Sequence, residues 1–260
     1  MRIDQYLVAQ GLIPTRSKAQ DAIKSGRVKV NDRIITKSSF SIQEEDDVIL
    51  ASSSLSFVSR AGYKLYDVID DFQLELKDRI CMDIGASTGG FSDVCIRQGA
   101  RLVYALDVGR DQLDPSLKQD SRIINREHIN CRYLTRDMFS PLPDFACMDV
   151  SFISIKLILP AIKEVMEKVE LVALIKPQFE AGKEHIGKHG IIKDKKIHVQ
   201  VLKDMVSYVQ EVGLYVHHLQ ASSILGRDGN KEFVMHVMSK PCTKAFDYKK
   251  IVETDPVRPS

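Results

Sequence analysis

Residues 83–91 read Asp-Ile-Gly-Ala-Ser-Thr-Gly-Gly-Phe and directly follow a short apolar run at 80–82. A buried strand that ends in an acidic residue and a glycine-rich turn, and then opens a helix, is how α/β folds bind a nucleotide-like cofactor. Gly85, Gly89 and Gly90 let the backbone approach a ligand that a Cβ atom would block. The spacing is Gly-x-x-x-Gly-Gly, whereas dinucleotide sites use Gly-x-Gly-x-x-Gly. The turn therefore favours a cofactor without phosphates, such as S-adenosylmethionine.

A second carboxylate ends the next apolar run, Val103-Tyr-Ala-Leu-Asp107, about one strand–helix–strand unit later. A carboxylate at that point can accept both hydroxyls of a cofactor ribose. The alternative is an acidic helix cap, which is common after a strand. For Asp107 alone the two interpretations are equally good, but together with the glycine turn it favours cofactor binding.

Length, composition and charge limit the classes of protein to which the chain can belong. The chain has 260 residues, 44% of them hydrophobic, which suits one large α/β domain with a soluble core plus a small second domain. The net charge is only +2, but residues 1–37 hold eight basic and three acidic residues. This local excess of positive charge predicts an anionic partner for the N-terminal segment.

The cysteines and the apolar runs indicate a cytoplasmic protein. No run approaches 18 apolar residues and no secretory signal is present, so we expect neither secretion nor a membrane span. His185, His189 and His198 have no ligand spacing, so we expect them on the surface of a loop and a helix, and we expect no metal. The five cysteines are scattered, odd in number and without metal spacing, and are predicted to be reduced thiols: Cys81, Cys95, Cys131, Cys147 and Cys242.

The first fifty residues predict a small α+β unit. Two short helices are expected at 3–10 and 16–25, the second capped by Thr15 and ended by Gly26. A tight hairpin around an Asn-Asp turn follows at 28–35, and a further strand is expected at 47–50.

The order of residues in this unit is more specific than its charge. Arg2-Ile-Asp, Arg16-Ser-Lys-Ala-Gln and Gly26-Arg-Val-Lys-Val-Asn follow one another as in the S4 RNA-binding domain, which the chain resembles over about residues 1–50. The resemblance implies contacts with RNA phosphates, which fix position rather than sequence. The side chains implied in RNA binding are Arg2, Arg16, Lys18, Lys24, Arg27 and Lys29, with Arg60 beyond the domain.

The rest of the chain alternates strands with helices, which predicts a parallel sheet, and ends in two strands that add an antiparallel edge. This is the plan of a class I, Rossmann-like methyltransferase with a mostly parallel seven-stranded sheet. The helices are expected near 59–65, 89–98, 158–169 and up to 211, and the strands near 79–84, 101–107, 122–125, 145–150, 170–175, 214–222 and 232–239.

The predicted domain limits follow from these elements. They are an S4 domain at 1–50, a linker at 51–58, a methyltransferase domain at 59–240 and a peripheral C-terminal tail at 241–260. The glycine- and lysine-rich stretch at 180–196 has no periodicity, and it is either a lid or RNA clamp or a plain surface loop.

Charged residues gather at one edge of the predicted sheet. Ligands of open α/β sheets bind beyond the carboxyl ends of the strands, where Asp149 and Lys176 are expected. Lys64 precedes the first strand, and Glu232 begins the last, antiparallel strand, so both belong to the same rim. A single lysine at a strand end is usually a surface charge, but two lysines and two carboxylates together can shift pKa values usefully.

These positions lie in stretches that resemble the FtsJ-like ribosomal RNA methyltransferases and, with the S4 unit in front, their TlyA-type or hemolysin A subgroup. The resemblance covers essentially the whole chain. It implies methyl transfer from S-adenosylmethionine to a ribose 2′-hydroxyl of ribosomal RNA by a tetrad at Lys64, Asp149, Lys176 and Glu232. The stretches are Ser59-Arg-Ala-Gly-Tyr-Lys-Leu, residues 83–91, Met148-Asp-Val-Ser-Phe, Leu174-Ile-Lys-Pro-Gln-Phe-Glu and Gly229-Asn-Lys-Glu-Phe.

The same resemblance implies the cofactor contacts. The turn carries Ser87-Thr88 where FtsJ itself has Ala-Pro, a small polar change that keeps the glycines. Asp107 is expected on the ribose, Glu127 and His128 near the adenine, and Asp149 near the methionine amino group. The remaining expected contacts are Asp83, Gly85, Ala86, Ser87, Gly89, Gly90 and Phe91.

A ribose hydroxyl is a weak nucleophile, whereas a methyl sulfonium is a strong electrophile, so the enzyme must align them and manage one proton. Lys176 is the candidate group, either as a neutral amine that takes the proton or as a cation that stabilises the alkoxide. Alternative functions are a non-catalytic rRNA-binding assembly factor, a membrane-lytic protein, and a methyltransferase for proteins or small molecules. The favoured target is a cytidine in a ribosomal subunit, and the favoured state is a monomer.

Overall fold

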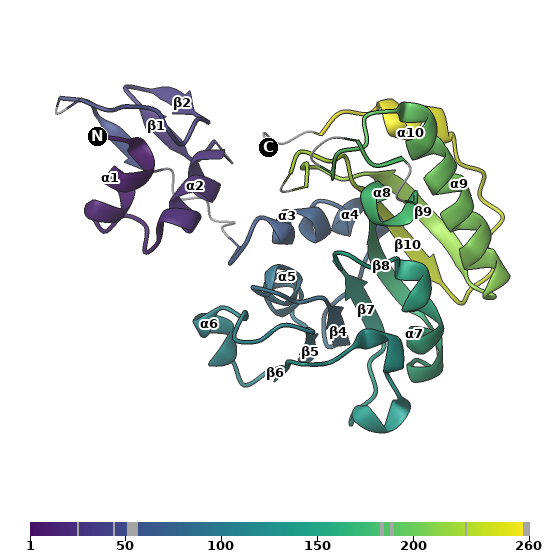
Figure 1. Ribbon diagram of the computed structural model, residues 1–260. Helices are drawn as coiled ribbons and strands as arrows, with labels where there is room; N and C mark the ends of the chain where they lie inside the picture. The colour runs from purple at the N-terminus through teal and green to yellow at the C-terminus, as the bar shows by residue number, and fades with distance from the viewer. Residues whose placement is uncertain are drawn as a thin grey trace.

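Two separate β-sheets organise the chain in the computed structural model (Figure 1). The structure describes residues 1–24, 26–43, 45–50, 57–182, 185–187, 190–226 and 228–256. Residues 51–56 of the predicted linker and the last four residues of the predicted tail therefore lie outside the described residues. The domain limits given above remain predictions.

The smaller sheet belongs to the N-terminal unit. Helices α1 (Ile3–Ala9) and α2 (Arg16–Lys24) precede strands β1 (Val28–Val30), β2 (Arg33–Ile35) and β3 (Val48–Leu50), which pair antiparallel in the order β2-β1-β3. The hairpin turn has positive φ at Asn31 (48°) and Asp32 (63°), as a two-residue turn of this kind requires. Thr15 Oγ1 accepts the Lys18 N–H at 3.3 Å, so the predicted cap of α2 is confirmed.

The larger sheet has seven strands in the order β6-β5-β4-β7-β8-β10-β9. Among the described strands of this sheet, β10 alone runs opposite to the other six and pairs antiparallel with β8 and β9, so the predicted mostly parallel sheet with an antiparallel edge is confirmed. The strands are β4 (Ile80–Ile84), β5 (Leu102–Leu106), β6 (Ile123–Arg126), β7 (Phe145–Met148), β8 (Glu170–Ile175), β9 (Tyr215–Ala221) and β10 (Phe233–Met238).

Helices cover both faces of this sheet (Figure 1). Helices α7 (Leu159–Val165) and α9 (Lys195–Glu211) pack on one face through the largest hydrophobic cluster. Helices α3 (Ala61–Tyr66), α4 (Ile69–Phe72) and α5 (Gly90–Arg97) pack on the other. The shorter helices are α6 (Pro115–Lys118) and α8 (Pro177–Glu180), with 3₁₀ turns at Cys131–Tyr133, Arg136–Met138 and Ile155–Leu157.

Two elements differ from the sequence predictions. The helix expected over 158–169 ends at Val165, because Met166 is extended (ψ 129°) where the chain turns into β8. The described part of the predicted tail, residues 241–256, is not peripheral, since it forms helix α10 (Tyr248–Glu253) and buries Val252 to 1% exposure. Its apolar residues pack against the same cluster as α9, and burial of that surface holds the helix in place.

The cysteines agree with the prediction of reduced thiols. All five are free, and four of them are buried. None of the described helices is both long and apolar enough to cross a membrane.

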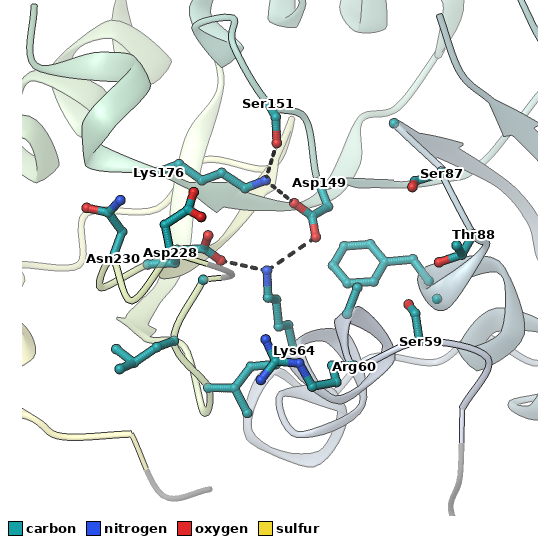
Figure 2. Close-up of a pocket in the computed structure, with 18 of the residues that line it drawn as sticks. Ser59, Arg60, Lys64, Ser87, Thr88, Asp149, Ser151, Lys176, Asp228 and Asn230 are labelled. Carbon is teal, nitrogen blue, oxygen red and sulfur yellow. Dashed lines mark hydrogen bonds and ion pairs between the residues drawn. The ribbon is translucent and has the colours of Figure 1, made fainter. Parts of the chain in front are cut away.

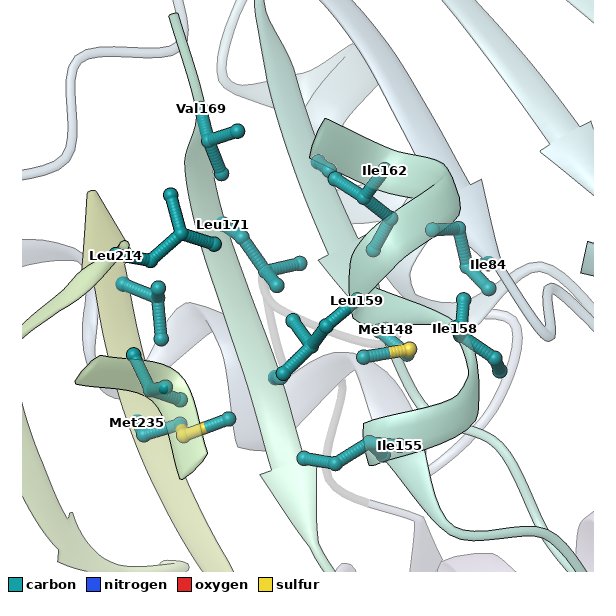
Figure 3. Packing of buried hydrophobic residues seen from close by; sticks show 14 of the residues in the cluster. Ile84, Met148, Ile155, Ile158, Leu159, Ile162, Val169, Leu171, Leu214 and Met235 are labelled. Atoms are coloured by element: carbon teal, nitrogen blue, oxygen red, sulfur yellow. The ribbon is translucent and has the colours of Figure 1, made fainter. Parts of the chain in front are cut away.

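Leu159 tests the packing of α7, because its side chain is fully buried between this helix and the sheet (Figure 3). We expect Leu159→Ala to lower the free energy of unfolding by about 2–5 kcal/mol, since it leaves a cavity that the core cannot close. Leu157 lies two residues away and is 53% exposed, so Leu157→Ala should cost less than about 0.5 kcal/mol. Urea unfolding of both variants measures the difference, and equal losses would contradict this packing.

Candidate active site

Four charged side chains meet at the carboxyl edge of the large sheet, and Figure 2 labels three of them, Lys64, Asp149 and Lys176. Lys64 comes from α3, Asp149 follows β7, Lys176 follows β8, and Glu232 precedes β10. Lys64 Nζ lies 2.6 Å from Glu232 Oε2 and 3.4 Å from Asp149 Oδ2. Lys176 Nζ lies 2.5 Å from the other oxygen of Asp149, so Asp149 joins the two lysines.

Lys64, Asp149, Lys176 and Glu232 form a quartet in which charges of opposite sign alternate, and this alternation stabilises their charged forms. The side chains are only 4–13% exposed. Burial by itself would lower the pKa of Lys64, but the carboxylates of Asp149 and Glu232 outweigh burial and raise it above its ordinary value. Burial would raise the pKa of Asp149, but the two ammonium groups outweigh it and lower that pKa. Lys64 is therefore a fixed cation between two carboxylates.

A cavity of about 600 Å³ opens beside the quartet. One wall is the glycine turn after β4, which contributes Gly85, Ala86, Ser87, Thr88 and Gly90. Gly85 has φ +80°, and a Cβ atom there would lie 2.7 Å from the carbonyl oxygen of Asp149. Glycine at this position lets the turn pack directly against the strand end that carries Asp149.

Asp83 lines this cavity and is 1% exposed. Its Oδ2 accepts hydrogen bonds from the Ser92 N–H at 2.8 Å and from the Ser92 hydroxyl at 2.7 Å. Its Oδ1 has no partner among the described residues. Burial raises the pKa of Asp83 to about 7, although the Ser92 hydrogen bonds oppose the shift. An unpartnered carboxylate oxygen in a cavity fits an ammonium group, such as the amino group of a bound methionine moiety.

Other predicted cofactor residues do not line this cavity. Asp107 accepts the Ser87 N–H at 2.8 Å and the Gly109 N–H at 2.6 Å, so it joins the glycine turn to the loop after β5. Glu127 accepts the Asp111 N–H at 2.7 Å. The cavity lining includes Phe91 but not Asp107, Glu127, His128 or Gly89, whose cofactor contacts stay predictions.

Two of the predicted RNA-binding residues share one buried carboxylate. Asp4 is fully buried and accepts hydrogen bonds from Arg2, Arg16 and Gln20. Burial would raise the pKa of Asp4, but these hydrogen bonds and the nearby arginine charge lower it strongly. Both guanidinium groups are about half exposed, so they are held in place yet remain accessible.

Two further predicted RNA-binding residues bridge the N-terminal unit and the methyltransferase fold. Lys18 Nζ lies 2.7 Å from Asp114 Oδ2, and Arg60 Nε lies 3.6 Å from Asp21 Oδ1. The remaining three form no ion pair with any residue that the structure describes: Lys24, Arg27 and Lys29.

The structure adds residues that the sequence analysis did not single out. Ser151 accepts a hydrogen bond from Lys176 Nζ at 2.9 Å. Phe152 lines the cavity with a 91% exposed side chain and positive φ of 65°, which is unusual for an aromatic residue. Asp228 and Asn230 also line the cavity (Figure 2). Ser151, Phe152 and Asn230 lie inside the stretches that resemble the family, so the resemblance could have pointed to them. Asp228 lies outside those stretches.

The histidines need one correction. His198 is not on the surface, since it is 4% exposed and packs edge-on against Phe233 with ring centroids 5.7 Å apart. Helix α9 turns this face toward β10, and burial lowers the pKa of His198. His185 is exposed, and His189 lies outside the described residues. Within the described ranges, no three residues are placed to hold a metal ion.

The strand order, the glycine turn and the buried quartet beside a cavity define a class I methyltransferase. The FtsJ-like methyltransferase family matches residues 57–238, and the S4 domain family matches residues 1–48. The chain therefore belongs to the FtsJ-like methyltransferases, in the TlyA-type group that joins them to an S4 domain. S-adenosylmethionine is its cofactor.

Three relatives show how far the similarity extends. The chain is 39% identical to hemolysin A of Brachyspira hyodysenteriae, covering 91% of this chain and 99% of that protein. It is 33% identical to the 16S/23S rRNA (cytidine-2′-O)-methyltransferase TlyA of Mycobacterium tuberculosis, covering 90% and 88%. The solved structure of a candidate hemolysin from Streptococcus thermophilus is 40% identical, with a TM-score of 0.76 and coverage of 97% and 94%.

Asp83 gives the site a pH signature. Its pKa is about 7 in the fold against an ordinary value of 3.8, so as pH rises the unfolded chain loses this proton first. Burial of Asp83 therefore lowers stability increasingly between about pH 4 and pH 7, by up to about 1.4 kcal/mol per pH unit. We expect Asp83→Asn to gain stability relative to the wild type across this range and to level off above it.

Urea unfolding of the cofactor-free protein at several pH values measures the difference in the free energy of unfolding between Asp83→Asn and the wild type. Asp70→Asn, at an exposed position on α4, is the matched control. If the stability of Asp83→Asn relative to the wild type stays constant or falls as pH rises, the raised pKa of Asp83 is contradicted.

Proposed function

We propose that this protein transfers a methyl group from S-adenosylmethionine to the 2′-hydroxyl of a cytidine ribose in ribosomal RNA. The observation that carries the proposal is the buried quartet of two lysines and two carboxylates beside the cavity of about 600 Å³. A ribosomal RNA cytidine is the target named for the M. tuberculosis relative, which aligns over most of this chain. We propose action in the cytoplasm as a monomer.

The two lysines have different roles in this proposal. Lys64 contacts two carboxylates, at 2.6 and 3.4 Å, and its raised pKa keeps it a cation that orders the site. Lys176 contacts one carboxylate and the hydroxyl of Ser151, so it retains donor capacity toward the cavity. Lys176 is therefore the group that meets the ribose hydroxyl.

The chemistry required of these residues is modest. Bound S-adenosylmethionine supplies a methyl group activated by a sulfonium centre. Lys176 as an amine takes the hydroxyl proton, or as an ammonium it stabilises the developing alkoxide while the hydroxyl proton passes to water. Asp149 and Ser151 hold its Nζ in one position, which favours in-line attack.

The mouth of the cavity suits a nucleotide that has left its base stack. Phe152 presents an exposed ring there, 5.1 Å from the ring of Phe179. An enzyme that reaches a ribose within folded RNA must turn the nucleotide outward, and an aromatic side chain can then stack on its base. This exposed ring supports an RNA substrate over a small molecule.

The S4 domain holds the RNA in this proposal. Lys24, Arg27 and Lys29 are free of ion pairs with described residues, and Arg2 and Arg16 are held half exposed by Asp4. Such groups position a phosphate backbone without reading sequence. Recognition of the target base is left to the cavity.

Lys176→Ala tests the catalytic core. We expect it to lower the rate of rRNA methylation by at least about 100-fold, because the ribose hydroxyl loses the group that takes its proton or stabilises its alkoxide. Cofactor binding, measured by calorimetry, should persist. The assay follows labelled S-adenosylmethionine into isolated ribosomal subunits, and alkali-resistant dinucleotides identify 2′-O-methylation.

Lys168→Ala is the matched control, since this lysine is exposed in the turn before β8. Undiminished labelling by Lys176→Ala, or labelling of protein rather than RNA by the wild type, would refute the proposal. Absence of any labelling by the wild type would favour a non-catalytic RNA-binding factor.

The S4 contribution has its own test. We expect the double variant Lys24→Gln, Lys29→Gln to weaken rRNA binding and raise KM for rRNA while kcat stays near the wild-type value. The dependence of log affinity on log salt concentration should flatten by about 1–2 units, the slope that two lost phosphate contacts produce. Lys37→Gln, exposed in the same domain, is the control. A fall in kcat with KM unchanged would contradict a purely docking role.

A further inference from the structure

The segment between β9 and β10 delivers Glu232 to the quartet. Residues 222–232 lie between the two strands, and their described part has no helix or strand of its own. Glu232 nevertheless reaches Lys64 at 2.6 Å and is 3% exposed. The Glu232 carbonyl oxygen accepts the Ser222 N–H at 2.9 Å, which continues the pairing of β9 and β10. The sheet therefore holds the backbone of Glu232, whereas the direction of its side chain depends on the loop that packs around it.

Asn230 makes contacts that hold this segment from one side. Its side chain is 2% exposed, and its Oδ1 accepts the Ile192 N–H at 3.1 Å. Its Nδ2 donates to the Gly190 carbonyl oxygen at 2.9 Å. The amide thus joins two strips of chain that lie 38–40 residues apart.

The backbone of Asn230 fixes the same segment from within. Its carbonyl oxygen accepts the Gly226 N–H at 2.9 Å, which closes the loop on itself. Gly226 packs directly against the carboxylate of Glu232, because a Cβ atom there would lie 2.4 Å from Oε1. A shift of Asn230 therefore moves the loop that confines the Glu232 carboxylate.

The residues next to Asn230 along the chain contact other parts of the molecule, so their contacts can be distinguished from those of Asn230. Lys231 Nζ donates to the Val252 carbonyl oxygen at 2.7 Å, at the end of α10. Phe233 packs against His198 of α9. Among the described residues, the hydrogen bonds between this loop and the 190–192 strip come from the amide of Asn230.

We propose that Asn230 is a positioning residue, which ties the strip at 190–192 to the loop around Glu232 and thereby holds the Lys64–Glu232 ion pair in its reactive arrangement. The inference rests on the proposed function. A buried amide is suited to this task because it offers one acceptor and one donor to two backbone groups at once. Neither an apolar residue nor a carboxylate of similar size satisfies both groups.

The experiment compares Asn230→Ala, Asn230→Asp and Val209→Ala. Val209 is fully buried in α9 away from the cavity, so its variant lowers stability without touching the loop. We expect Asn230→Ala to lower kcat about 10- to 100-fold, the scale of effect that a misplacement of about 1 Å produces, with KM for S-adenosylmethionine little changed. Val209→Ala, assayed well below its melting temperature, should keep the wild-type kcat.

Asn230→Asp supplies a readout that a general loss of stability would not give. Its carboxylate retains the acceptor for Ile192 but has no donor for Gly190, whereas its protonated form has both. The ratio of its kcat to that of the wild type should therefore rise as pH falls. Hydrogen exchange at the Ile192 and Gly226 amides should quicken together in Asn230→Ala.

Two results would overturn the inference. One is a kcat for Asn230→Ala equal to that of Val209→Ala, and the other is unchanged exchange at Ile192 and Gly226. Wild-type protein that fails to methylate rRNA would instead overturn the proposed function, and hydrogen exchange would still decide whether Asn230 joins the two segments.

Discussion

Everything at the carboxyl edge of the large sheet depends on burying four charges together. A single ammonium or carboxylate in such a place costs several kcal/mol of desolvation, and only close partners of opposite sign offset that cost. Asp149 sits between Lys64 and Lys176, and Glu232 pairs with Lys64, so each charge has a neighbour that stabilises it. Loss of any one member leaves an uncompensated charge, which explains why four separate elements must meet at one place.

The same network gives the site its chemical asymmetry. Both lysines line the cavity, but Lys64 is held by two carboxylates and stays charged, while Lys176 contacts one carboxylate and the hydroxyl of Ser151. Asp83, which also lines the cavity, differs from the carboxylates of the quartet, because it is buried without a cationic partner and its pKa rises to about 7. A buried carboxylate oxygen without a partner fits an ammonium group chemically.

The N-terminal unit treats its charges differently. Asp4 is buried so that two arginines are anchored, but their guanidinium groups stay about half exposed. Lys18 and Arg60 contact carboxylates across the two units. Anchored but accessible cations suit an RNA backbone, whereas the buried quartet suits a reaction that excludes water.

The local sequence pattern was sufficient to predict the seven strands, the capped helix at Arg16–Lys24 and the Asn31–Asp32 turn, because hydrophobic periodicity and turn chemistry act over a few residues. It also predicted the edge of the sheet at which the quartet gathers. The early end of α7, the packing of α10 and the burial of His198 were not predictable in this way, since each depends on what a distant element covers. The amide of Asn230 is the sharpest case. Its partners lie 38–40 residues away, and only the folded chain brings them within hydrogen-bonding distance.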